Sequence, residues 1–457
     1  MKRVLALAMA SAVAFGATAA QAQEKITVWF TKAFYPSEDK ALQDAIAKFK
    51  AKTGVDVELS LFSPEDVVTK SVSAVEAGTP PDVGFGLTYD FRVTGKWAFE
   101  GKLEDISDVI TPLKGQYLEG PLSTTFLLNG KTNKKAYYAA PVELQLMHIE
   151  YWIDMVQDAG FKESDVPEDW KGFWDFWCDK VQGALRKKGQ RVFGIGHPAS
   201  IQASDTVYSF SMFMNAYNVK VVDDDGKLVL DQPDNKAGFA KAIGDYASIV
   251  SRGCSPASSV NWTDVDNNLN FANKTTVMTH NATISIAAAQ MDAMNKTENT
   301  AEQRATAKTN YFEKIRTRGF PNKPDGGKTP QLAAVKTAVI FADAKNKKRA
   351  KEFLAFFLTE ENLQPYVEGS LGRWVPVTKK AIESPFWTDG KDPHRAQVIK
   401  QLNEGTVYFP FTKNWKFTVV NAENVWGRAT ARVAKDGVKP EEAAEDAIKR
   451  IKEILAQ

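Results

Sequence analysis

Alternating strand-like and helix-like segments near the N-terminus constrain the fold of this chain most strongly. Residues 26–30, 55–61 and 83–85 have the composition and alternation of short strands. Residues 38–52 and 64–77 lie between them and are typical of helices that end at glycines. This order, with its tight turns, predicts βαβ units in a mostly parallel sheet. Ligands bind beyond the carboxyl ends of such strands, which places residues 31–35 and 87–90 near any cleft.

A second strand pattern lies in the stretch from Tyr137 to Trp152. After Pro141, apolar residues alternate with Glu143, Gln145 and a methionine, so the predicted strand has one apolar and one polar face. A helix-like run begins near Tyr151. Two interpretations are open: an ordinary edge strand, or a strand that leaves one lobe and enters another.

Length and composition suggest a two-lobed, soluble globular protein. The chain has 457 residues, which is long for a single core. Its net charge is only +2 and its lysines are interleaved with acids, so no nucleic-acid partner is expected. The supply of 11 Trp, 12 Tyr and 27 Phe serves mainly the core, but it also suits a site that stacks against ring-shaped ligands.

The N-terminus has the pattern of a secretory signal peptide. Lys2 and Arg3 precede an apolar run that ends near Ala20, and Ala20-Gln21-Ala22 provides small residues before a cleavage site. The predicted signal peptide is residues 1–22. A membrane anchor is the alternative, but the run is shorter than the roughly 20 residues that span a bilayer. The mature protein is therefore expected in the periplasm.

The two cysteines, Cys178 and Cys254, suggest one disulfide in an oxidising compartment, with two free buried thiols as the alternative. The four histidines are dispersed, so no metal site is expected.

Known catalytic and cofactor motifs are not visible in the sequence. There is no phosphate-binding GxxxxGK[ST] motif, and the glycines at 194 and 196 lack the third glycine of a dinucleotide pattern. The stretch 368–372 lacks the first glycine of a nucleophile elbow. We therefore predict no catalytic residue and no cofactor. A pair of catalytic carboxylates stays possible, because spacing in sequence does not fix distance in space.

Four ordered passages together resemble the family of extracellular solute-binding proteins that serve carbohydrate ABC importers, which includes maltose-binding protein. They are the FKAKTGV segment at 49–55, GTPPDV at 78–83, the FANKTTVM strand at 271–278 with the following Asn281, and KRAKEFL at 348–354. The resemblance covers essentially the whole mature chain. One departure is His280-Asn281, where relatives often have a Gly-x-Trp turn, so a stacking aromatic is missing there.

The resemblance implies an α/β fold of the type II periplasmic-binding-protein kind, with two lobes joined by hinge crossovers. The amino-terminal lobe is expected to comprise residues 23–140 and 318–364, and the carboxy-terminal lobe residues 141–317 and 365–457. The first crossover falls on 141–145. Hinge closure around a carbohydrate would be followed by docking on the permease subunits. A monomer is expected.

The ligand positions of the family map onto side chains that suit a sugar. Aromatic rings cover the C–H faces of a sugar, while carboxylates, amides and arginine bind its hydroxyls. The candidates are Tyr35, Tyr89, Asp90, Glu143, Gln145, Asp205, Trp262, Asn281, Arg373 and Trp374. For Asp90 and Asp205, helix capping is an equally good interpretation.

Two other classes of function stay open. One is a binding protein for a non-sugar solute, such as a polyol phosphate or a peptide. A phosphate ligand would need convergent cationic side chains at the cleft, and Arg92, Arg318 and Arg373 are the candidates. A secreted carbohydrate-active enzyme would use Glu143 or Asp90 as its acid or base.

Overall fold

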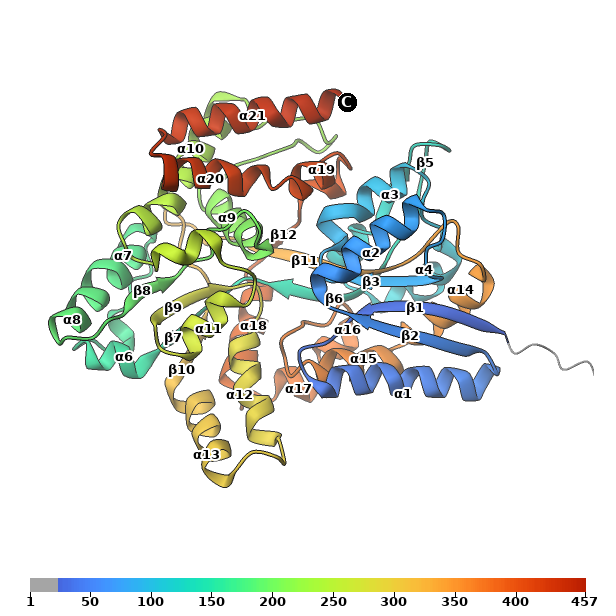
Figure 1. Ribbon diagram of the computed structural model, residues 1–457, viewed down its shortest axis with the longest axis horizontal. Helices are drawn as coiled ribbons and strands as arrows, with labels where there is room; N and C mark the ends of the chain where they lie inside the picture. The colour runs from blue at the N-terminus through green and yellow to red at the C-terminus, as the bar shows by residue number, and fades with distance from the viewer. Residues whose placement is uncertain (1–23) are drawn as a thin grey trace, which may run out of the picture.

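The protein contains two separate large β-sheets, each covered by helices (Figure 1). The structure, a computed structural model, describes residues 24–457. The predicted signal peptide, residues 1–22, lies outside the described residues. We call the six-stranded sheet with its helices the first lobe, and the four-stranded sheet with its helices the second lobe. The predicted two-lobed α/β fold is thus confirmed.

The first sheet is parallel where the βαβ pattern predicted it. Strand β1 pairs in parallel with β2 and with β3. Strand β11 comes from much later in the chain and pairs antiparallel with β3 and β6. The strands are β1 (Lys25–Thr31), β2 (Asp56–Phe62), β3 (Val83–Gly86), β6 (Ala140–Leu146), β11 (Gln331–Ile340) and β12 (Thr406–Val407). A separate hairpin pairs β4 (Phe126–Asn129) with β5 (Lys134–Tyr137).

The second sheet has the order β10-β7-β9-β8. Strand β7 is antiparallel to β9 and β10, and β8 is parallel to β9. The strands are β7 (His148–Trp152), β8 (Phe193–Gly196), β9 (Thr276–Asn281) and β10 (Ile315–Arg318). The helix expected from Tyr151 begins only at Ile153, because β7 continues to Trp152 through its pairing with β10.

The stretch that resembled either an edge strand or a connector joins the two sheets. Strands β6 and β7 are separated only by Met147, yet they belong to different sheets. Residues 319–330 make the second passage, from β10 to β11. Gln401 holds the first passage in place: its Nε2 donates to Met147 O (3.0 Å), and its Oε1 accepts from His148 Nδ1 (2.6 Å).

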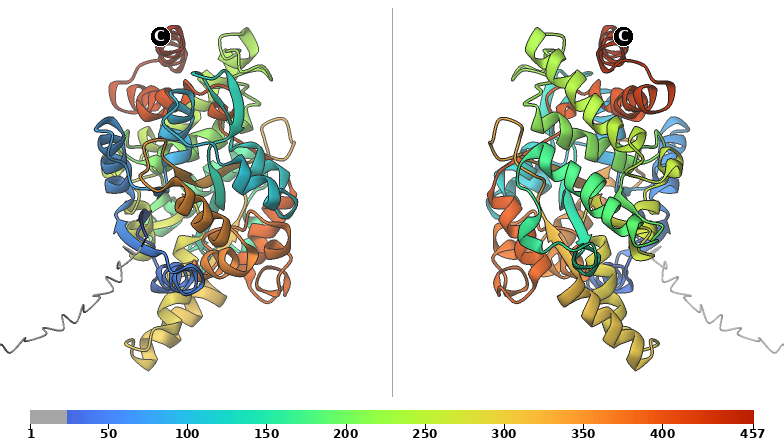
Figure 2. Two further views of the ribbon diagram at one scale, coloured as in Figure 1. Left: turned by 90° about the vertical axis from the view of Figure 1, so that its right-hand side faces the viewer. Right: turned by 90° about the vertical axis from the view of Figure 1, so that its left-hand side faces the viewer.

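Helices cover both sheets (Figures 1 and 2). Among residues 24–457, few large apolar side chains are exposed. The helices that pack mainly on the first sheet are α1 (Pro36–Thr53), α2 (Pro64–Glu76), α3 (Gly95–Phe99), α4 (Ser107–Leu113), α5 (Glu119–Ser123), α14 (Lys347–Phe357), α15 (Glu360–Gly369), α16 (Lys379–Ile382) and α17 (Pro385–Thr388). Helix α18 (Pro393–Asn403) packs on both sheets, since Val398 joins the first core and the helix contacts β10.

The helices of the second lobe enclose an aromatic core. They are α6 (Ile153–Asp158), α7 (Trp170–Asp175), α8 (Gln182–Lys187), α9 (Ser204–Ala216), α10 (Pro233–Ser251), α11 (Asp266–Ala272), α12 (Ser285–Asn295), α13 (Ala301–Thr309), α19 (Phe417–Ala422), α20 (Val425–Asp436) and α21 (Pro440–Ala456). The aromatic side chains of residues 173–177 are buried in this core. Helices α12 and α13 project from the body as a hairpin (Figure 2).

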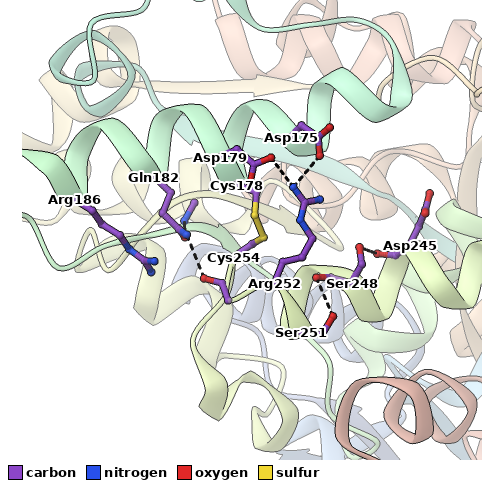
Figure 3. Close-up of a disulfide and its surroundings, with 12 residues drawn as sticks. Asp175, Cys178, Asp179, Gln182, Arg186, Asp245, Ser248, Ser251, Arg252 and Cys254 are labelled. Carbon is purple, nitrogen blue, oxygen red and sulfur yellow. Dashed lines mark hydrogen bonds and ion pairs between the residues drawn. A yellow bond between two sulfur atoms is a disulfide. The ribbon is translucent and has the colours of Figure 1, made fainter. Parts of the chain in front are cut away.

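The predicted disulfide between Cys178 and Cys254 is present (Figure 3). It joins the π-helical turn Phe176–Val181 to the loop after α10, and the two Cα atoms are 4.9 Å apart. Beside it, Arg252 forms ion pairs with Asp175 (2.8 Å) and Asp179 (2.7 Å). The bridge closes a loop within the second lobe. Among residues 24–457, no helix combines the length and the apolar character needed to cross a bilayer.

Candidate functional site

A cavity of about 160 Å³ lies between the two lobes, and both of them line it. Loops after the carboxyl ends of β1 and β3 contribute Phe34, Leu87 and Thr88, in keeping with the rule for parallel sheets. The other lining residues are Pro64, Glu65, Gln145, Ser204, Asp205, Tyr208, Asp264, Val265, Asn268, Asn281, Ala282, Thr283, Ser285, Arg373 and Trp374. We call this space the interlobe cavity.

Five of the predicted ligand residues line this cavity: Gln145, Asp205, Asn281, Arg373 and Trp374. They come from positions far apart in the sequence, and the fold brings them together. Tyr35 lies beside the cavity-lining Phe34 and is buried. Its hydroxyl donates to Ser285 O across the two lobes, at 2.8 Å. Burial raises the pKa of Tyr35 above its ordinary value, so the hydroxyl stays a donor at neutral pH.

Two other predicted residues, Tyr89 and Trp262, do not line the cavity. The ring of Tyr89 packs edge-on against Trp97, and its hydroxyl contacts Ser71 in the core of the first lobe. This is possible because Gly86 leaves free the space that the ring of Tyr89 fills. Trp262 is buried, and its Nε1 donates to Ser258 Oγ at 3.2 Å. The sequence pattern had placed both side chains at the cleft, but local packing turns them away from it.

A buried lysine on strand β11 is the centre of the first group of charges. Lys336 on β11 is 1% exposed, and its Nζ donates to Tyr208 OH (3.0 Å). The same Nζ lies 3.5 Å from Asp90 Oδ2. Burial raises the pKa of Asp90 to about 6 and lowers the pKa of Lys336. Sequence reasoning missed Lys336, although a single lysine in the apolar strand QLAAVKTAVI is a detectable signal.

Glu143 lies opposite Lys336 in the pairing of β6 with β11. It is fully buried, and neither of its carboxylate oxygens has a hydrogen-bond partner among the described residues. Burial, with the neighbouring Glu38 second, raises the pKa of Glu143 well above its ordinary value. Gln145 follows two positions later on the same face of β6 and lines the cavity, so Glu143 lies at the base of the site.

An arginine–glutamate pair completes this side of the cavity. Arg373 Nη1 lies 3.5 Å from Glu38 Oε2, and each side chain is only 3% exposed. The guanidinium lies 3.7 Å from the ring centre of Phe34 and 4.4 Å from that of Trp374, which are cation–π distances. Burial raises the pKa of Glu38 to about 7. Sequence reasoning missed Glu38, because an acid in the first turn of a helix is common there. We call Glu38, Asp90, Glu143, Lys336 and Arg373 the charged floor.

The opposite side of the cavity is a polar wall from the second lobe. Asp264 Oδ1 accepts from the backbone N of Asp205 (3.0 Å) and so caps α9, a role that sequence reasoning had given to Asp205 as an alternative. Asn267 Nδ2 donates to Asp205 Oδ2 (3.4 Å) and to Asn281 Oδ1 (3.3 Å). Burial, and then the charge of Asp264, raise the pKa of Asp205 well above its ordinary value. We call Asp205, Asp264, Asn267 and Asn281 the second-lobe wall.

Residues 44–397 match the model of a family described as bacterial extracellular solute-binding protein. The chain belongs to this family. It is 22% identical over 411 residues to the putative ABC transporter periplasmic-binding protein YcjN of Escherichia coli K12, covering 88% of this chain and 84% of the relative. The predicted resemblance is therefore confirmed.

Solved structures of similar proteins share the fold over nearly the whole chain. An ABC transporter solute-binding protein from Thermotoga lettingae, bound to α-D-tagatose, matches with a TM-score of 0.74 and 19% identity, covering 94% of this chain and 100% of that one. Maltose-bound MalE3 of T. maritima matches with a TM-score of 0.71 and 18% identity, and the match covers 94% of this chain and 99% of that one. A laminaribiose-bound sugar transporter from Arthrobacter chlorophenolicus matches with a TM-score of 0.71 and 17% identity, and the match also covers 94% of this chain and 99% of that one. Family membership and the YcjN relative indicate an extracellular or periplasmic location.

Proposed function

We propose that this protein is the periplasmic substrate-binding component of an ABC importer and captures a carbohydrate between its lobes. The observation that carries the proposal is the interlobe cavity, which side chains from both lobes line. Two hydrogen bonds fasten the lobes beside it: Tyr35 to Ser285 (2.8 Å) and Lys336 to Tyr208 (3.0 Å). The related structures that contain tagatose, maltose and laminaribiose support the choice of carbohydrate.

The proposed mechanism is closure of the lobes around the ligand. The passages at Met147 and at residues 319–330 are the two places where the strands change sheets, so rotation there separates the cavity walls. Closure removes water from the cavity, which strengthens every polar contact to the ligand. The closed form would then dock on the permease subunits as a monomer and release the ligand for transport.

Size and chemistry favour a small, hydroxylated ligand. The cavity of about 160 Å³ is below the 300–1,000 Å³ usual for drug-sized ligands, so we propose a molecule of monosaccharide size. Gln145, Asn281 and Asp205 can bind hydroxyls, while Phe34 and Trp374 offer rings to the C–H faces.

The two alternative functions receive less support. Of the three arginines considered for a phosphate, only Arg373 lines the cavity, and it is paired with Glu38. Arg318 lines a different cavity and is paired with Glu168 (2.8 Å). For an enzyme, the family consists of solute-binding proteins, and we propose no catalytic residue.

The lobe boundaries also belong to this proposal. The predicted division at residues 140, 317 and 364 stays a prediction. Strand pairing supports a first crossing at Met147. Trp374 packs in the core of the first lobe, and Val375 forms a bridge with Leu144, so we propose that the first lobe also includes the segment around residues 365–387.

The test is binding of a panel of monosaccharides and polyols to the mature protein, measured by thermal shift and calorimetry. One member should raise the melting temperature and be recovered unchanged. Glu143→Ala should weaken this binding, with a far-UV spectrum like that of the native protein. Chemical turnover of the bound sugar would contradict a pure binding role, and an unchanged affinity of the variant would remove Glu143 from the site.

A further inference from the structure

The carboxylates around the interlobe cavity outnumber the basic groups. The two buried cations are already paired, Arg373 with Glu38 and Lys336 with Asp90, each at 3.5 Å. Glu143, Asp205 and Asp264 form no ion pair among the described residues (24–457). Two of these three, Asp205 and Asp264, line the cavity directly, and the exposed Glu65 adds a fourth acid at its rim.

Hydrogen bonds satisfy these carboxylates unequally. Asp264 accepts from Ser204 Oγ (2.6 Å) and from the backbone N of Asp205 (3.0 Å), but no cation among the described residues is paired with it. Asp205 is 5% exposed, and Asn267 provides its only side-chain hydrogen bond among the described residues, a long one of 3.4 Å. Glu143 is fully buried without any hydrogen-bond partner among residues 24–457. A buried carboxylate without a compensating charge is unfavourable and is relieved either by a proton or by a cation. Burial accordingly raises the pKa of both side chains.

We propose that the ligand carries an ammonium group on a small hydroxylated frame, as in an amino sugar or an amino polyol, and that Asp205 and Asp264 bind this group. The inference rests on the proposed function and specifies the ligand class for the same cavity. An ammonium group supplies a positive charge and three hydrogen-bond donors at one point. A hydroxyl supplies one donor and leaves the carboxylates uncompensated when closure removes the water.

The surroundings of this pair fit a cation better than an anion. Tyr208 lines the cavity one helical turn after Asp205, and its aromatic ring already attracts one ammonium group, because Lys336 Nζ lies 4.9 Å from the ring centre. Lys336 approaches from β11, but it is held by Asp90 and by Tyr208 OH. Arg373 lies on the charged floor and is held by Glu38. A phosphate or a sugar acid would therefore face the unpaired acids without a free cation.

The experiment compares sugars that share one frame and differ in charge. Glucose, glucosamine, N-acetylglucosamine and glucuronate form one set, and the galactose and mannose series form two more. Calorimetry on the mature protein at pH 7 should show one amine binding at least tenfold more tightly than its neutral and N-acetylated partners. Repeating the titration in buffers of different ionisation enthalpy should show proton release, because the ammonium displaces protons from the carboxyl groups.

The variant Asp205→Asn removes the charge but keeps the shape of the side chain. It should weaken amine binding at least tenfold and change the binding of the N-acetylated partner by less than threefold. Asp66→Asn makes the same change at an exposed position on α2 that does not line the cavity; it is the matched control and should change amine binding by less than threefold. The melting temperature of each ligand-free variant checks that it is folded.

The outcomes separate the two proposals. A neutral or acidic member that binds as tightly as the amine would overturn the ammonium inference while supporting carbohydrate binding. If Asp205→Asn weakens the binding of all members equally, Asp205 recognises a hydroxyl group. That result would also overturn the ammonium inference. If no member of the three series binds to the folded protein, the ammonium inference is wrong, while the wider panel of monosaccharides and polyols decides the proposed carbohydrate function separately.

Discussion

The charged floor and the second-lobe wall face the same cavity, but they differ in how their charges are balanced. On the floor, Arg373 and Lys336 each have an acid within 3.5 Å, so two of its acids are neutralised inside the first lobe. On the wall, Asp205 and Asp264 lie side by side without a basic partner among the described residues. The comparison indicates that both cations of the floor are already balanced before a ligand arrives, whereas the two aspartates of the wall have no cation of their own among the described residues.

Removing the disulfide of the second lobe should have the largest effect on the free energy of unfolding. The single disulfide lies in the second lobe, where it links residues 76 positions apart. Closing a loop of this length restricts the unfolded chain by about 4 kcal/mol. Replacing Cys178 and Cys254 by alanine should lower the free energy of unfolding by roughly that amount, measured by urea denaturation.

If the two lobes unfold separately, only the transition of the second lobe should move in this variant. The first lobe has no disulfide among the described residues, so its transition is the internal control. A shift of both transitions by the same amount would show that the lobes unfold as one unit.

Breaking a pair on the floor should have the next largest effect. Arg373→Ala leaves the buried carboxylate of Glu38 without its cation, and losing one partner of a buried pair costs about 3 kcal/mol. Removing an unpaired acid from the wall, as in Asp205→Asn, should leave the stability of the ligand-free protein unchanged or slightly higher. Thermal denaturation of both variants measures the contrast. Equal destabilisation would contradict the distinction between floor and wall.

The free energy of unfolding should depend on pH because buried acids in both lobes have shifted pKa values. Burial raises the pKa of Glu38 to about 7 and that of Glu150 in the second lobe to about 8. A group with a raised pKa binds its proton more tightly in the folded state, so stability is lost as the pH rises through the folded pKa. Burial lowers the pKa of His148 to about 4, and this group gains stability as the pH rises towards 6.5.

Between about pH 4.5 and 6.5 the gain from His148 offsets only part of the loss from the two glutamates. Above pH 6.5 the loss continues without this offset, so the free energy of unfolding should fall by about 2 kcal/mol between pH 6.5 and pH 8. Urea unfolding at several pH values measures it. Glu150→Gln should remove most of the decrease above pH 7, whereas Glu38→Gln should act mainly below it. A decrease that persists in both variants would mean that other groups cause it.

The hydrogen bond between the lobes should have the smallest effect. Tyr35→Phe removes the hydroxyl that donates to Ser285 O and leaves the packing of the ring unchanged. A neutral hydrogen bond contributes about 1 kcal/mol, so ligand affinity should fall about fivefold through a less stable closed form. Small-angle scattering with a saturating ligand should still show a closed protein. A loss of more than 100-fold would instead indicate that Tyr35 contacts the ligand.

Local sequence patterns predicted the elements of the first lobe well, because their periods depend only on neighbouring residues. Helix α1 begins at Pro36 and ends before Gly54, close to the predicted 38–52, since this glycine adopts the left-handed conformation that stops a helix. In the second lobe, strand β9 continues beyond the 271–278 segment to Asn281 through its pairing with β7, so α12 begins only at Ser285.

The charges of the site could not be predicted from local patterns in the same way. Glu38 and Arg373 are 335 positions apart, and their pairing depends on the packing of α1 against the loop after α15. Tyr89 and Asp90 are adjacent in sequence, yet one lies in the core and the other beside Lys336. The side chain of Tyr89 turns into the core because Gly86 leaves space for its ring. The identities of residues 89 and 90 alone do not reveal that space.

Gln401 restricts the ways in which the lobes can move. Its amide binds Met147 and His148 together, at the single residue that separates β6 from β7. In the proposed closure, a linker with its backbone fixed on one side would have little freedom to twist, which favours rotation of the lobes about nearly one axis. A ligand that is too large would then hold the lobes apart by an angle, because no sideways slip would absorb the excess. Under the proposed function, the size of a ligand would thus be converted into an opening angle.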